Sequence, residues 1–405
     1  MASRSTSKRR ERPSMSLLRE SPSLDLRSLI DQGYEIRIED NYLVMGHVPF
    51  LNASGVVEFG ELISELLVSG TETLRPDPHT VYFTGVPHDT QGRPLVKIIA
   101  GVMSQVLTPT LTAATFLSSK PPIGYYSDYH AKMTQYAKMI WGWAQAVDPD
   151  VTARTYRPVI VNESDSVFEY LDSASSRAGI TELTRRLARG PVAVIGLGGT
   201  GSYLLDLLVK TPVEQIHLWD SDVFSAHNAF RAPGAASVID LNARPLKVDY
   251  YTTIYSKMRR GIFPHPQRIE EENVSELAGM SFVFVCMDAG PSKRVIVEYL
   301  ISKGIPFIDT GMGVQRQGDA LGGVVRVTTS AEGQHAHVLN RVSFADEQHD
   351  EYDRNIQIAE LNSLNATMAV IKWKKLMGFY LDHEKELHST YTVSGNFFAN
   401  SENSE

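Results

Sequence analysis

The hydrophobic pattern of residues 24–149 consists of short runs broken by turn residues. Apolar stretches at 42–45 and 80–83 are each followed within two residues by a glycine, which is typical of strands that end in turns. The last stretch before Pro149 has apolar residues at helical spacing, which predicts a helix that the proline ends. Its apolar face consists of Met133, Tyr136, Ala137, Ile140, Ala144 and Val147. We therefore expect a small mixed α+β domain.

The second half of the chain alternates strand and helix patterns. A helix is expected at 180–189 and another at 202–209, between runs that predict buried strands at 192–195, 215–219, 282–287 and 305–308. A longer helical pattern follows, with Leu361, Leu364, Met368 and Ile371 on one face. Such alternation predicts an α/β fold, namely a Rossmann-like, mostly parallel sheet with helices on both faces.

Composition divides the chain into four segments. A chain of 405 residues exceeds what one hydrophobic core usually supports, so two domains are expected. Residues 1–20 are rich in Ser and Arg and predict a disordered basic tail. We assign the mixed domain to 21–155 and the α/β domain to 160–395, with a polar tail at 396–405.

Charge and cysteine content exclude several classes of protein. A formal net charge of -8 argues against binding of nucleic acid beyond a mononucleotide. The single cysteine, Cys286, allows neither an intrachain disulfide nor a zinc site built of cysteines. No run approaches the length of a membrane span and no secretory signal is present, so we expect a cytoplasmic protein without a membrane partner.

A glycine-rich turn follows the strand at 192–195. Gly196, Gly198, Gly199 and Gly201 lie between this strand and the helix at 202–209, at a spacing that presents backbone N–H groups to a phosphate. The same pattern fits the dinucleotide fingerprint of NAD-dependent enzymes. The alternative is a turn that serves only close packing of the helix.

The polar residues after the next strand favour one kind of nucleotide chemistry. Asp220 lies where a carboxylate accepts hydrogen bonds from ribose, which is compatible with NAD and ATP alike. Arg231 and Lys247 lie beyond it. Hydride transfer does not need these cations, whereas attack of a carboxylate on an α-phosphate gathers negative charge that fixed cations stabilise. Taken singly, both are more often surface cations, and Asp222 is equally suited to capping the loop.

The full set of motifs resembles the ThiF-type adenylyltransferase family, which includes the ubiquitin-activating enzymes and the activators of sulfur-carrier proteins. The resemblance covers about residues 175–380, and the domain before it is similar to one found in bacterial members. The family pattern is Gly-x-Gly-Gly-x-Gly-Ser, Asp-x-Asp, Asn-x-x-Arg, Lys and Asp. Its counterparts here, in order, are residues 196–202, Asp220 and Asp222, Asn228 and Arg231, Lys247, and Asp288.

The resemblance implies a role for each of these positions. Asp220 would hold the ribose of ATP, and Asn228, Arg231 and Lys247 would contact its phosphates. Asp288 would hold Mg²⁺. The residues agree with this last role, because Asp288 follows the strand at 282–287 and Mg²⁺ commonly binds one carboxylate together with phosphate oxygens.

The chain also departs from the family pattern. It lacks the downstream cysteine that carries a thioester, and Cys286 falls within a predicted strand, where a thiol is a buried hydrophobe. Ala289 follows Asp288 where the family often has asparagine, and the basic residue that the family usually has a few positions on is matched by Lys293 or Arg294. Arg185 and Arg186 resemble the position from which a second protomer supplies an arginine, which implies a homodimer; the alternative is an exposed helix face.

These observations predict an ATP-dependent adenylyltransferase. Its substrate would be the C-terminal carboxylate of a ubiquitin-like protein, a sulfur-carrier-like protein or a peptide, and its product an acyl-adenylate. The domain at 21–155 would recruit the substrate or a conjugating-enzyme partner. The alternatives are a peptide-modifying adenylyltransferase that leaves the nucleotide attached, a catalytically silent ThiF-like adaptor and, less favoured, a NAD-dependent oxidoreductase.

Overall fold

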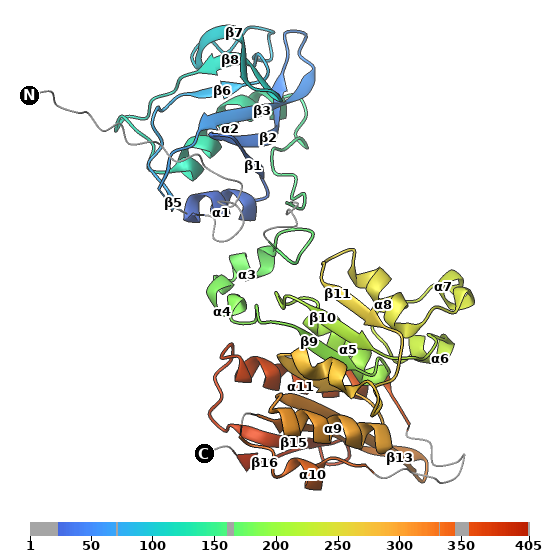
Figure 1. Cartoon of the computed structure of the whole chain (residues 1–405). Coiled ribbons are helices and arrows are strands. Elements are labelled where there is room, and N and C mark those ends of the chain that lie inside the picture. Colours follow the sequence, from blue (N-terminus) through green and yellow to red (C-terminus); the bar gives the residue numbers. More distant parts are fainter. Residues whose placement is uncertain (1–22, 70–71, 160–165, 332, 345–355, 404–405) are drawn as a thin grey trace, which may run out of the picture. The chain divides into compact units, whose positions relative to one another are not determined.

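The computed structural model describes residues 23–69, 72–159, 166–331, 333–344 and 356–403 (Figure 1). It divides into two compact units, each with its own core. Unit 1 comprises Met1–Ser166 and Tyr170–Gly179, and unit 2 comprises Val167–Glu169 and Ile180–Glu405. The basic tail expected at residues 1–20 lies outside the described residues.

Unit 1 is the expected mixed α+β domain. Its antiparallel sheet has the strand order β1-β2-β3-β6-β8-β7, and helices α1 and α2 contribute to its core. The strands are β1 (Glu35–Glu39), β2 (Tyr42–Leu51), β3 (Val57–Glu65), β6 (Val81–Phe83), β7 (Ile99–Thr108) and β8 (Leu111–Leu117), with a separate pair formed by β4 (Val68–Ser69) and β5 (Glu72–Thr73). The helices are α1 (Leu24–Asp31), α2 (Tyr129–Gln145) and α3 (Ser173–Arg177).

Helix α2 has most of the buried face that the apolar pattern predicted. Its N-terminus is capped by Asp128, whose side chain accepts a hydrogen bond from the backbone N–H of Ala131. The predicted face is fully buried at Met133, Tyr136, Ala137, Ile140 and Ala144. The prediction was wrong for Val147, which is 51% exposed, because the helix ends at Gln145 and residues beyond it no longer follow helical spacing.

Unit 2 contains the expected mostly parallel sheet. Its strand order is β11-β10-β9-β12-β13-β14-β15-β16, parallel from β11 to β13 and antiparallel from there on. The strands are β9 (Val192–Ile195), β10 (Ile216–Trp219), β11 (Ile262–His265), β12 (Phe282–Val285), β13 (Phe307–Gln317), β14 (Ala320–Ser330), β15 (Glu386–Thr392) and β16 (Phe397–Asn403).

Helices cover both faces of this sheet, as predicted. Val192 and Val194 of β9 pack in the core that includes α5 (Gly199–Leu208), α8 (Lys247–Tyr255) and α11 (Ala359–Leu376). Ala193 and Ile195 face the opposite core, with α9 (Pro291–Lys303) and the 3-10 helix η2 (Val274–Gly279). The remaining helices are α4 (Thr181–Arg185), α6 (Ala226–Ala229), α7 (Val238–Ala243) and α10 (Val338–Arg341). Strands buried on both faces explain the continuous apolar runs.

Two sequence predictions for unit 2 need correction. The segment 396–405, expected as a polar tail, instead contains β16, which pairs with β15 at the sheet edge. Backbone hydrogen bonds form such an edge strand, so it needs little apolar sequence. The predicted face of α11 is only partly right: Leu361 is buried and Leu364 and Met368 pack in the same cluster, but Ile371 is 41% exposed. Asn362 and Asn365 are buried as well, which the apolar pattern did not indicate.

Candidate functional site

The predicted nucleotide-binding residues lie around the central strand of unit 2. Strand β9 is flanked by β10 on one side and β12 on the other, and all three are parallel. The chain therefore leaves β9 for one half of the sheet and returns on the other side of it. In open α/β sheets, the crevice at such a reversal, beyond the carboxyl ends of the strands, is where ligands bind.

The glycine turn lies at this position, and most of its glycines leave no space for a side chain. Gly196 has φ 88°, and a Cβ there would lie 2.7 Å from the carbonyl oxygen of Cys286. A Cβ at Gly201 would collide with the Gly196 carbonyl oxygen, and one at Gly199 would collide with the side chain of Asn362. Gly198 differs, because a Cβ there would meet no atom within 4 Å. The turn is thus closely packed at Gly196, Gly199 and Gly201 and open at Gly198. This open position lies beside the first N–H groups of α5, which lack helical partners.

Asp220 connects the end of β10 to the glycine turn. Its Oδ2 accepts a hydrogen bond from the backbone N–H of Leu197 at 2.7 Å, and its Oδ1 accepts one from Asp222 N–H at 2.8 Å. Lys247 Nζ lies 3.4 Å from the same Oδ2 atom. The turn, the carboxylate and the cation, which are far apart in sequence, therefore meet at one oxygen atom.

Lys247 is held by a second carboxylate as well. Its Nζ donates to Asp222 Oδ2 at 2.7 Å, and the residue is only 5% exposed. The hydrogen bond from Lys247 holds the pKa of Asp222 below its ordinary value. Arg268 lies 3.8 Å from the other oxygen of Asp222. Lys247 is therefore a fixed, mostly enclosed positive charge next to the turn.

Asn228 and Arg231 lie in and just after the short helix α6. Asn228 is 4% exposed, and its Oδ1 accepts a hydrogen bond from Ser225 N–H at 3.0 Å, which closes a capping box. Arg231 Nε is enclosed and has no hydrogen-bond partner among the described residues. An enclosed guanidinium N–H without an acceptor suits an anionic ligand.

Asp288 is exposed in the loop that follows β12. Lys293 of α9 anchors this loop, because its Nζ donates a hydrogen bond to the carbonyl oxygen of Met287 at 3.1 Å. Lys293 also forms an ion pair of 2.6 Å with the fully buried Asp309, and Arg326 Nη2 lies 2.7 Å from the other oxygen of Asp309. Sequence reasoning noted Lys293 but missed Asp309 and Arg326.

The side chains present fit a magnesium ion that arrives with a nucleotide. Across the described ranges, no group of three or more His, Cys, Asp or Glu side chains is arranged to hold a metal ion. Asp288 by itself supplies one exposed carboxylate. Mg²⁺ usually binds through one or two carboxylates plus substrate phosphates and water, so this donor set agrees with the ion's chemistry.

Cys286 is enclosed in unit 2, and the two arginines expected at a dimer contact have partners within the same unit. Burial raises the pKa of the Cys286 thiol to about 12, which keeps the thiol protonated and unreactive at neutral pH. Arg185 forms an exposed ion pair of 2.8 Å with Glu182 of its own helix, and Arg186 donates to the carbonyl oxygen of Gly378.

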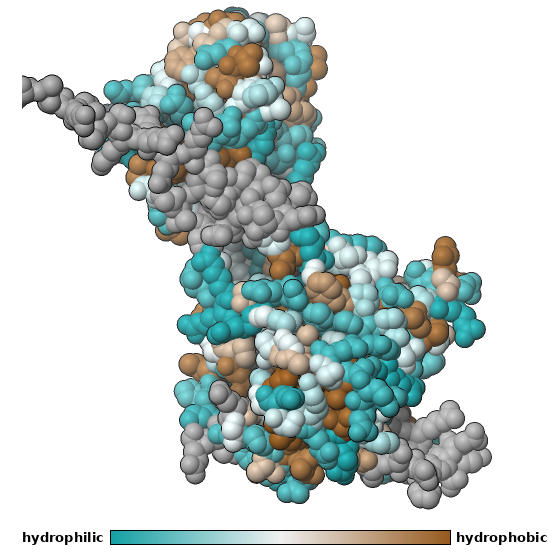
Figure 2. All heavy atoms as spheres, viewed as in Figure 1, coloured by the Kyte–Doolittle hydropathy of each residue, from teal (hydrophilic) through white to brown (hydrophobic). Residues whose placement is uncertain are grey.

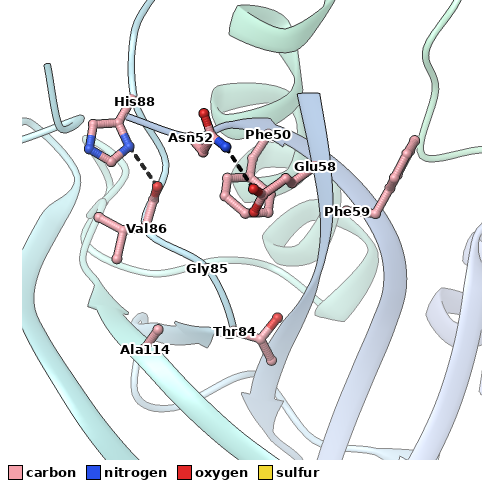
Figure 3. Close-up of a pocket in the computed structure, with 9 residues that line it drawn as sticks. All are labelled: Phe50, Asn52, Glu58, Phe59, Thr84, Gly85, Val86, His88 and Ala114. Atoms are coloured by element: carbon pink, nitrogen blue, oxygen red, sulfur yellow. Dashed lines mark hydrogen bonds between the residues drawn. The ribbon is translucent and has the colours of Figure 1, made fainter. Parts of the chain in front are cut away.

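Unit 1 has a separate pocket of ≈ 370 Å³ between its strands (Figure 3). Asn52 Nδ2 donates to Glu58 Oε1 at 2.6 Å at one side of it, next to the ring of Phe50. On another side, His88 Nδ1 lies 2.8 Å from the carbonyl oxygen of Val86. The pocket thus combines an aromatic wall with one carboxylate.

The fold and the residues at its reversal point define an α/β protein with a ThiF-type adenylyltransferase fold. The ThiF family model matches residues 148–403, and a second model, a domain of unknown function (DUF6791), matches residues 24–173. The chain therefore belongs to the ThiF family and carries an additional N-terminal domain.

Solved structures with a similar fold have low sequence identity to this chain. The crystal structure of E. coli MccB with MccA-N7isoASN is 15% identical, with a TM-score of 0.43 over 56% of this chain and 69% of that chain. E. coli MccB with ATP is 14% identical, with a TM-score of 0.44 over the same shares of the two chains. PaaA is 18% identical, with a TM-score of 0.41 over 55% and 75%.

No curated protein matches the chain. Among the described residues, no helix has both the length and the apolar character needed to cross a membrane.

Proposed function

We propose that this protein is an ATP-dependent adenylyltransferase that activates the C-terminal carboxylate of a ubiquitin-like protein, a sulfur-carrier-like protein or a peptide. The observation that carries the proposal is the meeting of the Leu197 N–H and Lys247 Nζ at one oxygen of Asp220. It joins a phosphate-binding turn, a ribose-type carboxylate and a fixed cation. We assign this activity to residues 160–395.

The reaction needs no group on the enzyme to become covalently attached. An oxygen of the substrate carboxylate attacks the α-phosphorus of ATP, and the bond from that phosphorus to the bridging oxygen of the β-phosphate breaks. The products are an acyl-adenylate and pyrophosphate. Negative charge builds on the α-phosphate oxygens as the new bond forms, and fixed cations in an enclosed site stabilise it.

Each predicted site residue has a role that its position supports. Backbone N–H groups from Gly198 to Gly201 bind phosphate oxygens at the start of α5. Asp220 still has lone pairs free to accept ribose hydroxyl groups, since a carboxylate offers about four acceptor positions. Lys247 and the unpaired Nε of Arg231 stabilise the developing charge, and Asn228 holds α6 in place. Asp288 would hold Mg²⁺, and the bound ion would neutralise negative charge on the phosphates.

The chemistry of Cys286 supports release of the adenylate to another molecule. A thiol whose pKa is raised to about 12 is a poor nucleophile at neutral pH. The acyl group would therefore pass to a nucleophile on a partner, such as a conjugating enzyme. A peptide-modifying enzyme that leaves the nucleotide attached is the second candidate, since it requires no thiol at all.

Partner binding is assigned to two parts of the chain. Unit 1, which includes residues 21–155, would recruit the substrate or the conjugating partner. For a homodimer, exposed apolar side chains at α6 and α7 offer a contact surface, and Figure 2 shows hydrophobic spheres over α7. These side chains are Phe230, Val238 and Ile239, which are 87%, 72% and 80% exposed.

The test is exchange of labelled pyrophosphate into ATP, with and without a ubiquitin-like protein or a peptide as substrate. We expect exchange that requires the substrate and that falls at least about a hundredfold in Asp288→Asn and Lys247→Met, as for loss of one stabilising group in other enzymes. Lys210→Met is the matched control, because Lys210 is half exposed and its ion pair is with Asp206, four residues before it, in α5. Its exchange rate should match the wild type.

The other outcomes separate the candidate functions. ATP binding without exchange, for every substrate tried, would contradict the adenylation proposal and favour a silent adaptor. A product that retains AMP after the reaction favours the peptide-modifying enzyme, and mass spectrometry of the substrate distinguishes the two.

A further inference from the structure

Helix α11 places a buried amide directly against the glycine turn. Asn362 is 0% exposed, and its Oδ1 accepts a hydrogen bond of 3.0 Å from the hydroxyl of Thr200, in the first turn of α5. This contact joins residues 162 positions apart in the chain. It is the side chain of Asn362 that a Cβ at Gly199 would strike. The amide therefore occupies the space directly behind the first residue of α5.

The stability of the fold does not explain an asparagine at this position. Asn362 Nδ2 is enclosed and has no acceptor among the residues that the structure describes. A buried donor without a partner loses its hydrogen bonds to water and gains none in return. An apolar side chain would fill the same space between α11 and α5 without that loss. What the asparagine adds is its Oδ1, which fixes the Thr200 hydroxyl.

The first turn of α5 is where the direction of the backbone matters most. Its N–H groups lack helical partners and, under the proposed function, bind phosphate oxygens. Ser202 Oγ already bonds the carbonyl oxygen of Gly199 within this turn, at 2.8 Å. The Thr200–Asn362 hydrogen bond adds a fixed point from outside the helix, next to three glycines that constrain the backbone weakly.

We propose that Asn362 is a positioning residue that sets the phosphate-binding turn by holding Thr200. It does not contact the ligand itself. This inference rests on the proposed nucleotide site of unit 2, and it goes beyond that proposal by assigning part of the site to α11. The turn motif alone would then be insufficient for full phosphate affinity.

The test measures binding of ATP, tripolyphosphate and adenosine to the full-length protein by calorimetry. Asn362→Ala and Thr200→Val each remove one partner of the hydrogen bond, and Thr200→Val nearly preserves side-chain shape. We expect both to weaken ATP and tripolyphosphate binding at least about tenfold while adenosine binding stays unchanged. The double variant should be no weaker than either single variant, since both act through one contact.

The matched control is Asn365→Ala. Asn365 is a second buried amide of α11, and its Nδ2 donates to the carbonyl oxygen of Gly311 on β13 rather than to a residue of the glycine turn. This variant should bind all three ligands as the wild type does. If Asn362→Ala does not fold, Thr200→Val and the control still decide the question.

Three results would overturn the inference. One is unchanged ATP affinity in Thr200→Val, and another is equal weakening of ATP and adenosine, which indicates general loss of structure. The third is a wild-type protein that binds neither ATP nor tripolyphosphate, which overturns the proposed function together with this inference. Normal wild-type binding with unaffected variants removes the positioning role alone.

Discussion

At the scale of single residues, Asp309 is a buried carboxylate of unit 2 that needs nearby positive charges. It is fully buried on β13, and its two oxygens face Lys293 at 2.6 Å and Arg326 at 2.7 Å. Its carboxylate is therefore compensated by two cations from different elements. Because Lys293 also bonds the carbonyl oxygen of Met287, this cluster supports the loop that carries Asp288.

We predict that Asp309→Asn lowers the free energy of unfolding by about 3–5 kcal/mol, because the substitution leaves the buried Lys293 and the partly buried Arg326 without their counter-charge. Urea-induced unfolding followed by circular dichroism measures this. Asp319→Asn is the control, since Asp319 is fully exposed and 3.7 Å from Arg316, so it should change the value by less than about 1 kcal/mol. Equal effects of the two variants would show that the buried pairs contribute little.

The sequence could indicate only part of this cluster. Lys293 was noted because it follows Asp288 at a short distance, which is local information. Asp309 and Arg326 meet it through the pairing of β12 with β13 and of β13 with β14. No spacing along the chain encodes that meeting, since it depends on the order of strands in the sheet.

At the scale of elements, the strand, glycine turn and helix from 192 to 208 were predicted well. Strand β9 has the predicted bounds, and α5 begins at Gly199, within the turn rather than at residue 202. The signal is local: an apolar run and glycines at fixed spacing determine both the strand and the turn.

We predict that two glycines of this turn respond differently to alanine. Gly201→Ala places a Cβ against the Gly196 carbonyl oxygen, a backbone atom that cannot move aside, and should cost about 1–3 kcal/mol of stability or more. Gly198→Ala enters open space on an extended backbone and should cost less than about 1 kcal/mol. Thermal unfolding compares the two. Matching losses would show that backbone freedom, rather than close packing, requires these glycines.

Helix α11 was an element whose buried side the sequence predicted only in part. The predicted face of Leu361, Leu364, Met368 and Ile371 packs in a core at all positions except Ile371. The buried side also includes Asn362, Asn365 and Ala369, which the apolar pattern did not indicate. Small and amide side chains are buried there because α11 packs closely on the glycine-containing start of α5. Hydrophobic periodicity finds the helix and most of its apolar face, but it does not indicate which polar side chains are buried next to that face.

At the scale of the whole molecule, the predicted site residues all belong to unit 2. Unit 2 has cores on both faces of its own sheet, and its short segment Val167–Glu169 pairs with residues near Arg260. All of the described residues named for the candidate site come from unit 2. The two units therefore allow binding and recruitment to be separated experimentally.

We predict that a fragment of residues 166–405 folds and binds ATP within about threefold of the affinity of the whole chain, because a compact unit with its own core folds alone. Calorimetry with both proteins measures this. Pyrophosphate exchange that depends on a protein substrate should fall in the fragment if unit 1 recruits that substrate. A fragment that folds but loses ATP binding would contradict the assignment of the site to unit 2.

The sequence by itself determined the α/β class, the strands around the glycine turn and the order of the ThiF motifs, because each is encoded in local spacing and apolar periodicity. Only the tertiary structure decided that Lys247 and Leu197 share an oxygen of Asp220, that Asn362 lies behind Gly199, and that β16 completes the sheet. These contacts join residues distant in sequence, and the packing of strands and helices, rather than any local preference, brings them together.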